Sequence, residues 1–228
     1  MRKIGAAVIH SVGQGLGAQC GCCGEGPLTE RGTGGHGWQE SLCAPCRLDW
    51  PPPWSPSGPE PTAESGTTFL GLWAYQGSLR RLLVQAKEEV RGAPSILLQR
   101  AIQEELARRM SRCLWPGRVW NPVPPSRRRR WHGAYLPEEL GPVAAKQLGE
   151  KWRRGLCRVK QVPAQTGLSG EQRRRNLEGA FVYRRRAPSA LTLFDDVRTT
   201  GASLEEATRA VRAAGATLVR QVVVAVVP

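Results

Sequence analysis

The sequence predicts an α/β protein in which a parallel sheet is flanked by helices and preceded by a small four-cysteine module. Two observations predict the α/β part: from Thr67 onward strand patterns alternate with helix patterns, and Val222–Val227 is apolar on both faces, as a buried parallel strand is. The third observation is a pair of Cys-x2-Cys sequences near the N-terminus. Together they predict one good-sized domain with a metal-binding segment in front of it.

Hydrophobic spacing places the elements of the larger domain. Apolar residues three and four apart predict helices, and short apolar runs between turn signals predict strands. Gly141-Pro142 limits how early the third helix begins, and Gly215 ends the last one. The expected strands are Thr67–Trp73, Arg118–Val123, Leu191–Phe194 and Val222–Val227, and the expected helices cover Leu79–Ala86, Ser95–Met110 (with Ser95 as the cap), Val143–Gly149 and Leu204–Ala214.

Composition divides the chain into three parts. Residues 1–50 hold the cysteine pairs, residues 51–66 form a Pro/Ser/Gly linker, and residues 67–228 form the α/β domain. No apolar run reaches the length of a membrane-spanning helix, so we expect no membrane insertion. Polar residues interrupt the apolar stretch after the basic N-terminus, which disfavours a signal peptide and predicts a cytoplasmic location.

The two cysteine pairs, Cys20-x2-Cys23 and Cys43-x2-Cys46, predict a structural zinc site. Each turn can present two thiolates on one side of a metal, and two turns complete a tetrahedral four-thiolate site. A segment this short buries little apolar surface, so a metal would supply its stability. Four protein ligands leave no open position on Zn²⁺, so we expect no catalysis there.

The chain is strongly basic, with a formal net charge of +14. Sixteen Lys or Arg and only five Glu lie between Ser126 and Phe194. Such a zone attracts polyanions, either nucleic acid or a pyrophosphate group, and Arg128, Arg129 and Arg130 are its candidate contacts. The alternative is that these arginines form ordinary solvated surfaces.

The most informative segment runs from Leu191 to Ser203. An apolar strand ends in Asp195-Asp196, and Thr199-Thr200-Gly201-Ala202-Ser203 leads into a helix. Backbone N–H groups and the helix dipole favour an anion at such a turn, where glycine lets the anion approach closely. The paired carboxylates suit ribose hydroxyls or a Mg²⁺ ion that the substrate carries. The candidate binding residues here are Asp195, Asp196, Val197, Arg198, Thr199, Thr200, Gly201, Ala202 and Ser203.

This segment resembles the 5-phosphoribosyl-1-pyrophosphate (PRPP) motif of type I phosphoribosyltransferases. Three features in order make the chain similar to the ComF family. They are the four-cysteine segment followed by Pro51-Pro52-Pro53-Trp54, then Tyr75-Gln-Gly-Ser-Leu79 with Lys87 eight residues on, and then Gln165-Thr-Gly-Leu168-Ser169 with Arg173, Asn176 and Gly179-Ala180-Phe181 ahead of the PRPP-type motif.

The resemblance implies a zinc module joined to a type I phosphoribosyltransferase-like domain that binds PRPP with Mg²⁺. It also implies a role in natural competence, in handling incoming single-stranded DNA together with a helicase-like partner. By the same resemblance Arg173 and Asn176 are site residues. The loop that the fold uses for pyrophosphate corresponds to Pro124, Pro125, Ser126 and Arg127.

The chain departs from the family pattern at two places. Where the family has Arg-Gly-Phe-Asn-Gln, this chain has His132-Gly133-Ala134-Tyr135-Leu136, and Thr199 stands where many purine phosphoribosyltransferases carry an aspartate that acts as a base. No catalytic residue is therefore assigned. Three functions stay open: a PRPP-binding protein serving DNA uptake, an active phosphoribosyltransferase of nucleotide metabolism, and a non-catalytic accessory protein that binds nucleic acid.

Overall fold

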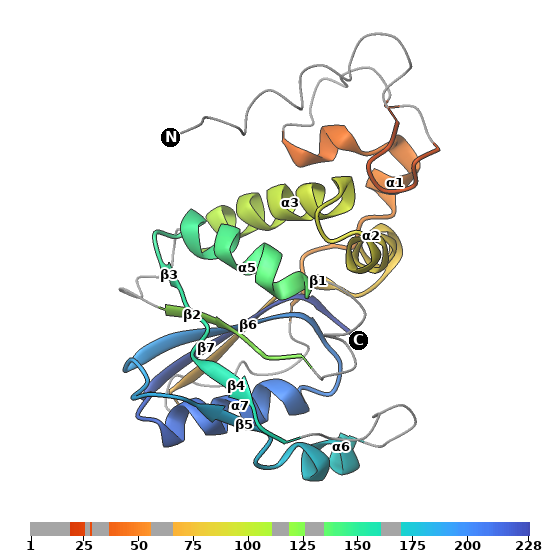
Figure 1. Ribbon diagram of the computed structural model, residues 1–228. Helices are drawn as coiled ribbons and strands as arrows, with labels where there is room; N and C mark the ends of the chain where they lie inside the picture. Colours follow the sequence, from red (N-terminus) through yellow and green to blue (C-terminus); the bar gives the residue numbers. More distant parts are fainter. Residues whose placement is uncertain are drawn as a thin grey trace.

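The computed structural model describes residues 19–25, 28, 37–55, 66–110, 119–125, 135–160 and 170–228. They form an α/β protein with a five-stranded sheet between two layers, and the cysteine-bearing segment lies beyond the helices of one layer (Figure 1). The fold class expected from the sequence is therefore confirmed.

The central sheet is parallel throughout and has the order β1-β7-β6-β2-β3. Both β6 and β7 are buried along most of their length and are mostly apolar, with Val222–Val226 of β7 apolar throughout, as strands buried on two faces require. Asp195 lies opposite Val223, and Phe194 lies between Pro122 and Val222. The strands are β1 (Thr67–Ala74), β2 (Val119–Pro122), β3 (Lys151–Trp152), β6 (Ala190–Arg198) and β7 (Leu218–Val226).

Different elements cover the two faces of the sheet. Helices α2 (Gly77–Glu88), α3 (Ala93–Met110) and α5 (Leu136–Gln147) pack on one face around Trp120 and Phe194. Helix α7 (Ala202–Ala213) and the antiparallel pair β4 (Leu156–Arg158) and β5 (Phe181–Tyr183) pack on the other around Leu193 and Val223. The short helix α6 (Gly170–Leu177) lies on this second side, next to α7 (Figure 1).

The connections leave the middle of the sheet in opposite directions. Strand β2 leads through α5 to its outer neighbour β3, whereas β6 leads through α7 to β7 on the other side. The two helices cover opposite faces, so the chain diverges between the carboxyl ends of β2 and β6. A parallel sheet forms a crevice at such a topological switch point, where ligands commonly bind.

The cysteine-bearing segment shares the core of the α/β domain. It contains the one-turn helix η1 (Trp38–Ser41) and the short helix α1 (Ala44–Leu48). The ring centroids of Trp38 and Trp50 are 4.3 Å apart, and Trp50 also packs edge-on against Trp73 of β1 at 5.6 Å. Pro53 bridges to Trp73, so the start of the expected linker lies along β1, while residues 56–65 are outside the described residues.

Two of the expected helix starts were wrong. Helix α5 begins at Leu136 instead of Val143 and continues through Pro142, which costs one backbone hydrogen bond while the helix buries Leu136 and Leu140. A side chain at Gly141 would lie 2.1 Å from the Trp152 ring, so the glycine lets α5 approach the sheet closely. Ser95 lies inside α3 and donates to the Glu89 carbonyl oxygen, so it is not the cap.

Candidate functional site

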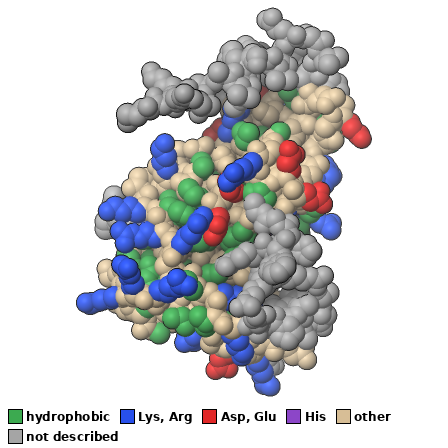
Figure 2. Space-filling model, viewed as in Figure 1, with side chains coloured by type: hydrophobic (Ala, Val, Ile, Leu, Met, Phe, Trp, Pro, Cys, Tyr) green, Lys and Arg blue, Asp and Glu red, His purple; other side chains and the backbone are tan. Residues whose placement is uncertain are grey.

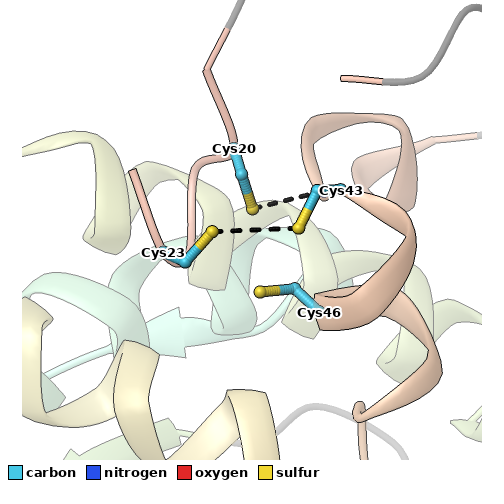
Figure 3. Close-up of side chains that lie close together, drawn as sticks. All are labelled: Cys20, Cys23, Cys43 and Cys46. Carbon is cyan, nitrogen blue, oxygen red and sulfur yellow. Dashed lines mark hydrogen bonds between the residues drawn. The ribbon is translucent and has the colours of Figure 1, made fainter. Parts of the chain in front are cut away.

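Four cysteines form a cluster that can hold one metal ion (Figure 3). Cys20 and Cys23 lie on a tight turn, while Cys43 and Cys46 lie at the start of α1. Their four Sγ atoms are all within 4.8 Å of one another, and the sulfurs of Cys23 and Cys43 are 3.8 Å apart. Zn–S bonds of about 2.3 Å in a tetrahedron place sulfurs about 3.8 Å apart, so these residues fit such an ion.

Backbone N–H groups favour negative charge on the sulfur of Cys20. For Cys43 the backbone of Cys46 acts in the same direction, but burial and hydrogen bonds with the neighbouring thiols raise the pKa to about 12. Burial alone would raise the pKa of the Cys20 thiol, but backbone N–H groups of Cys23, Cys43 and Cys22 lower that pKa below its ordinary value. The N–H groups of Cys43 and Cys22 lie 3.2 and 3.4 Å from Cys20 Sγ. Arg81 of α2 adds a cation, with one terminal nitrogen 3.8 Å from Cys46 Sγ.

Cys22 lies within the first cysteine pair but is not part of the cluster. Its thiol donates to the Ser78 carbonyl oxygen at 3.5 Å, and burial raises the pKa of Cys22 to about 12. It therefore remains a protonated core thiol. Ser78 and Arg81 both also contact Asp49, so the metal-binding segment is attached to the first half of α2.

Asp195 and Asp196 lie in the last part of β6, which continues to Arg198, beyond the strand end expected at Phe194. They are 9% and 2% exposed, so both carboxylates need partners. Asp196 Oδ2 lies 2.8 Å from Lys87 Nζ, and its Oδ1 accepts the Val197 N–H at 2.8 Å. Asp195 Oδ1 accepts its neighbour's N–H at 2.9 Å and faces the Tyr135 hydroxyl at 3.2 Å.

The loop after β6 forms a close turn into α7. Gly201 is the N-cap of α7 and has φ 81°, a left-handed conformation that favours glycine. A Cβ at this position would lie 2.9 Å from Arg198 Nε. The Arg198 guanidinium also lies 4.6 Å from the Phe69 ring centre. Gly201 and Ala202 are both buried, so the turn packs closely against the Arg198 side chain.

The other residues expected in this loop surround the turn. Thr199 is exposed, Thr200 and Ser203 are half-buried, and Ala202 is buried as the first residue of α7. The hydroxyl-bearing residues are therefore the ones that solvent and ligand can reach. This arrangement matches the strand, loop and helix that the sequence predicted.

The loop after β2 comes to the same place. Val123 N donates to the Phe194 carbonyl oxygen at 3.0 Å, which brings Pro124 and Pro125 alongside the end of β6. Both prolines are buried. The remaining residues predicted for this loop, Ser126 and Arg127, and the basic residues Arg128, Arg129 and Arg130 lie outside the described residues.

Helix α6 is fixed beside the N-terminus of α7. Arg174 donates to both carboxylate oxygens of Glu205, at 2.7 and 3.3 Å. Asn176 is half-buried on α6, and for Arg173 only the backbone is described. The sequence selected Arg173 from this basic run, whereas the contact with α7 in the described part of the chain comes from Arg174.

The structure thus brings Asp195, Asp196, the loop over residues 199–203 and the start of the β2 loop together at the carboxyl ends of β2 and β6. Two further residues contact the acidic pair, Lys87 and Tyr135, and the sequence did not assign either to the site. In the sequence Lys87 appears only as part of the family-like pattern after Leu79, and it lies in the last turn of α2. Tyr135 appears only where the chain departs from the family pattern, and nothing local in the sequence connects it to β6.

Comparison with known proteins found no protein-family model that matches the chain, and no curated protein matches it either. Within the described part of the chain, no helix is long and apolar enough to cross a membrane.

Proposed function

We propose that this protein binds a phosphorylated ribose, PRPP or a related phosphoribosyl compound, in the crevice between β2 and β6. The observation that carries the proposal is the position of Asp195 and Asp196 next to the glycine turn that begins α7, at the switch point of a parallel sheet. Acceptors for sugar hydroxyls and donors for a phosphate then lie side by side.

The turn over residues 199–203 supports the phosphate end of the ligand. A helix N-terminus carries partial positive charge and presents N–H donors that have no carbonyl partner within the helix. Gly201 permits close approach of a phosphate oxygen, while Thr200 and Ser203 can add hydroxyl donors. The half-buried Arg198 supplies a nearby cation.

The carboxylates support the sugar end. Hydrogen bonds from the N–H groups of Asp196 and Val197 orient the carboxylates of Asp195 and Asp196. Little side-chain conformational entropy is therefore lost when a ligand hydroxyl binds. Mg²⁺, which prefers oxygen ligands and keeps several waters, would arrive with the pyrophosphate of PRPP. Lys87 offers a further cation that lies on the same edge of the sheet.

We infer that the four-cysteine cluster holds a structural Zn²⁺. The cluster uses Cys20, Cys23, Cys43 and Cys46 as its four ligands, which saturates a tetrahedral ion. The segment that bears it contacts α2 through Asp49 and packs its tryptophans on β1. The ion would therefore stabilise a part of the core that supports Lys87.

The resemblance to the ComF family supports a wider role in natural competence, with single-stranded DNA and a helicase-like protein as partners. The net charge of +14 fits a nucleic-acid partner. Phosphoribosyl transfer is the second candidate function. In that reaction a nucleophile would displace pyrophosphate at the anomeric carbon, and the acidic pair and phosphate loop would hold the ribose in place. Thr199 in place of an acidic base favours binding over transfer.

Isothermal titration of the purified protein with ribose 5-phosphate, PRPP with Mg²⁺, pyrophosphate and inorganic phosphate tests the proposal. We expect ribose 5-phosphate and PRPP to bind more tightly than the two inorganic anions, because only they reach the acidic pair. Equal affinity for all four would indicate binding through arginines alone. Release of pyrophosphate from PRPP with a panel of nucleobase acceptors then separates transfer from binding.

A further inference from the structure

Tyr135 contacts both strands that border the switch point, β6 at Asp195 and the end of β2 at Val123. It directly precedes α5, and its hydroxyl lies 3.2 Å from Asp195 Oδ1 at the end of β6. The same hydroxyl contacts the carbonyl oxygen of Val123, the first residue after β2. The side chain therefore spans the switch point at the place where the proposed ligand would lie.

The two carboxylates of the pair receive chemically different donors. Asp196 is paired with the ammonium group of Lys87, whereas Asp195 faces the neutral hydroxyl of Tyr135. A phenol against a carboxylate is the same pairing that a sugar hydroxyl would make. Asp195 thus already lies against a neutral hydroxyl, and Asp196 is paired with a cation of the protein itself.

The tyrosine hydroxyl has one proton and, among the described residues, reaches two acceptors. It can donate to Asp195 or to Val123, but not to both at once. If a ligand hydroxyl takes over Asp195, the tyrosine keeps Val123 as its acceptor, and no buried donor is left unpaired. The exchange therefore avoids the penalty that accompanies an unsatisfied polar group.

We propose that Tyr135 determines the specificity of the crevice by holding Asp195 in the place of a ligand hydroxyl. This inference rests on the proposed function, because it assigns a role to a residue of the same site. It narrows the ligand class to phosphorylated compounds whose ring hydroxyl can replace the tyrosine. A ring phosphate without hydroxyls would bind no better than its phosphate group alone.

The experiment compares the parent protein with Tyr135→Phe by calorimetry, using ribose 5-phosphate and tetrahydrofurfuryl phosphate, which has the ring and phosphate but no ring hydroxyls. Loss of one competing hydrogen bond should tighten ribose 5-phosphate binding by about three- to tenfold. Binding of tetrahydrofurfuryl phosphate should not change. The matched control is Tyr183→Phe, because the Tyr183 hydroxyl lies beside Asn121 and not beside Asp195; it should leave both affinities unchanged.

The outcomes separate this inference from the proposed function. If the parent binds ribose 5-phosphate and Tyr135→Phe binds it equally or less tightly, the proposed function stands and the role of Tyr135 is overturned. An equal gain for both ligands also overturns it, because the hydroxyls are then irrelevant. Binding that occurs only in Tyr135→Phe supports the inference directly. If neither protein binds, both proposals fail.

A second measurement keeps Tyr135 in place and observes its ring directly. The chain has three tyrosines, so Tyr75→Phe/Tyr183→Phe leaves Tyr135 as a single reporter. With tyrosine labelled at the ring carbon that bears the hydroxyl, ribose 5-phosphate should shift the one NMR signal, whereas tetrahydrofurfuryl phosphate should leave it in place. A signal that moves equally with both ligands would contradict the exchange.

Discussion

Lys87 of α2 places its ammonium nitrogen 2.8 Å from Asp196 Oδ2 at the end of β6. The carboxylate side chain is 3% exposed, while the lysine side chain is 35% exposed. The pair therefore compensates a buried charge from the solvent side and connects the helix layer to the candidate site. On the face shown in Figure 2, basic side chains lie across much of the surface. Other basic residues of the described part of the chain, such as Arg209 with Glu206, also pair with a buried carboxylate.

Lys87→Met should destabilise the fold because it leaves the Asp196 carboxylate buried without its cation. We expect the free energy of unfolding to fall by about 1–3 kcal/mol, between the values for exposed and fully buried pairs. Asp196→Asn added to Lys87→Met should restore part of this loss. Denaturant unfolding of both variants and of Asp196→Asn alone measures the coupling. Strict additivity of the two single changes would contradict the pairing.

Most of the α/β fold could be predicted from sequence, because hydrophobic spacing indicates two kinds of element. These are strands buried on both faces, such as β6 and β7, and amphipathic helices, such as α2 and α7. The short elements could not. Strands β3 to β5 owe their pairing to residues distant in sequence, and α5 passes Pro142 only because its packing over Trp152 outweighs a lost hydrogen bond.

The candidate site also contains residues that the sequence predicts and residues that it does not. The cysteine quartet and the Asp195–Ser203 segment are local patterns with a chemical reason for each residue, so the sequence predicts them. Lys87 and Tyr135 reach the site only through the sheet order and the helices that follow β1 and β2. Contacts of this kind depend on tertiary placement, which no local pattern encodes.

The four-cysteine cluster should bind one zinc ion per chain, with all four thiolates as ligands. Cys23→Ser/Cys43→Ser should lose the metal, as measured by elemental analysis of the purified protein. Because Trp38 and Trp50 of this segment pack on Trp73, loss of the metal should also lower the melting temperature of the α/β domain. Cys22→Ser is the matched control and should keep its zinc. Full occupancy in the double variant would contradict the assignment.

Comparing Gly201→Ala with Gly149→Ala separates the effect of backbone strain on stability from the loss of phosphate binding. An alanine in the left-handed conformation costs about 1–2 kcal/mol, and here its Cβ would also press against Arg198. Gly149→Ala is the control, because Gly149 also has a positive φ of 66° but would meet nothing within 4 Å. Both variants should lose stability, whereas only Gly201→Ala should weaken ribose 5-phosphate binding, as calorimetry would show. If both variants bind ribose 5-phosphate equally tightly, the loop over residues 199–203 does not form part of the binding site.

If the arginines before α5 contact nucleic acid, single-stranded DNA binding should weaken steeply as salt rises. Neutralising Z phosphates of a single strand gives a log–log slope of about −0.7Z. Replacing Arg128, Arg129 and Arg130 with alanine should therefore make the slope shallower by up to roughly two units. Arg91→Ala, which removes an exposed arginine paired with Glu139, is the control. An unchanged slope in the triple variant would assign these arginines to a solvated surface.

The most direct test of the central claim is calorimetric titration of PRPP with Mg²⁺ into the parent protein and into Asp195→Asn/Asp196→Asn. The substitution keeps the shape of both side chains but removes the charge that accepts ribose hydroxyls. Charge-assisted hydrogen bonds contribute on the order of 1.5–3 kcal/mol each, so PRPP affinity should fall at least about tenfold. Affinity for plain pyrophosphate should change little. If the variant binds PRPP as tightly as the parent, and pyrophosphate binds equally well, the crevice between β2 and β6 is not a phosphoribosyl site.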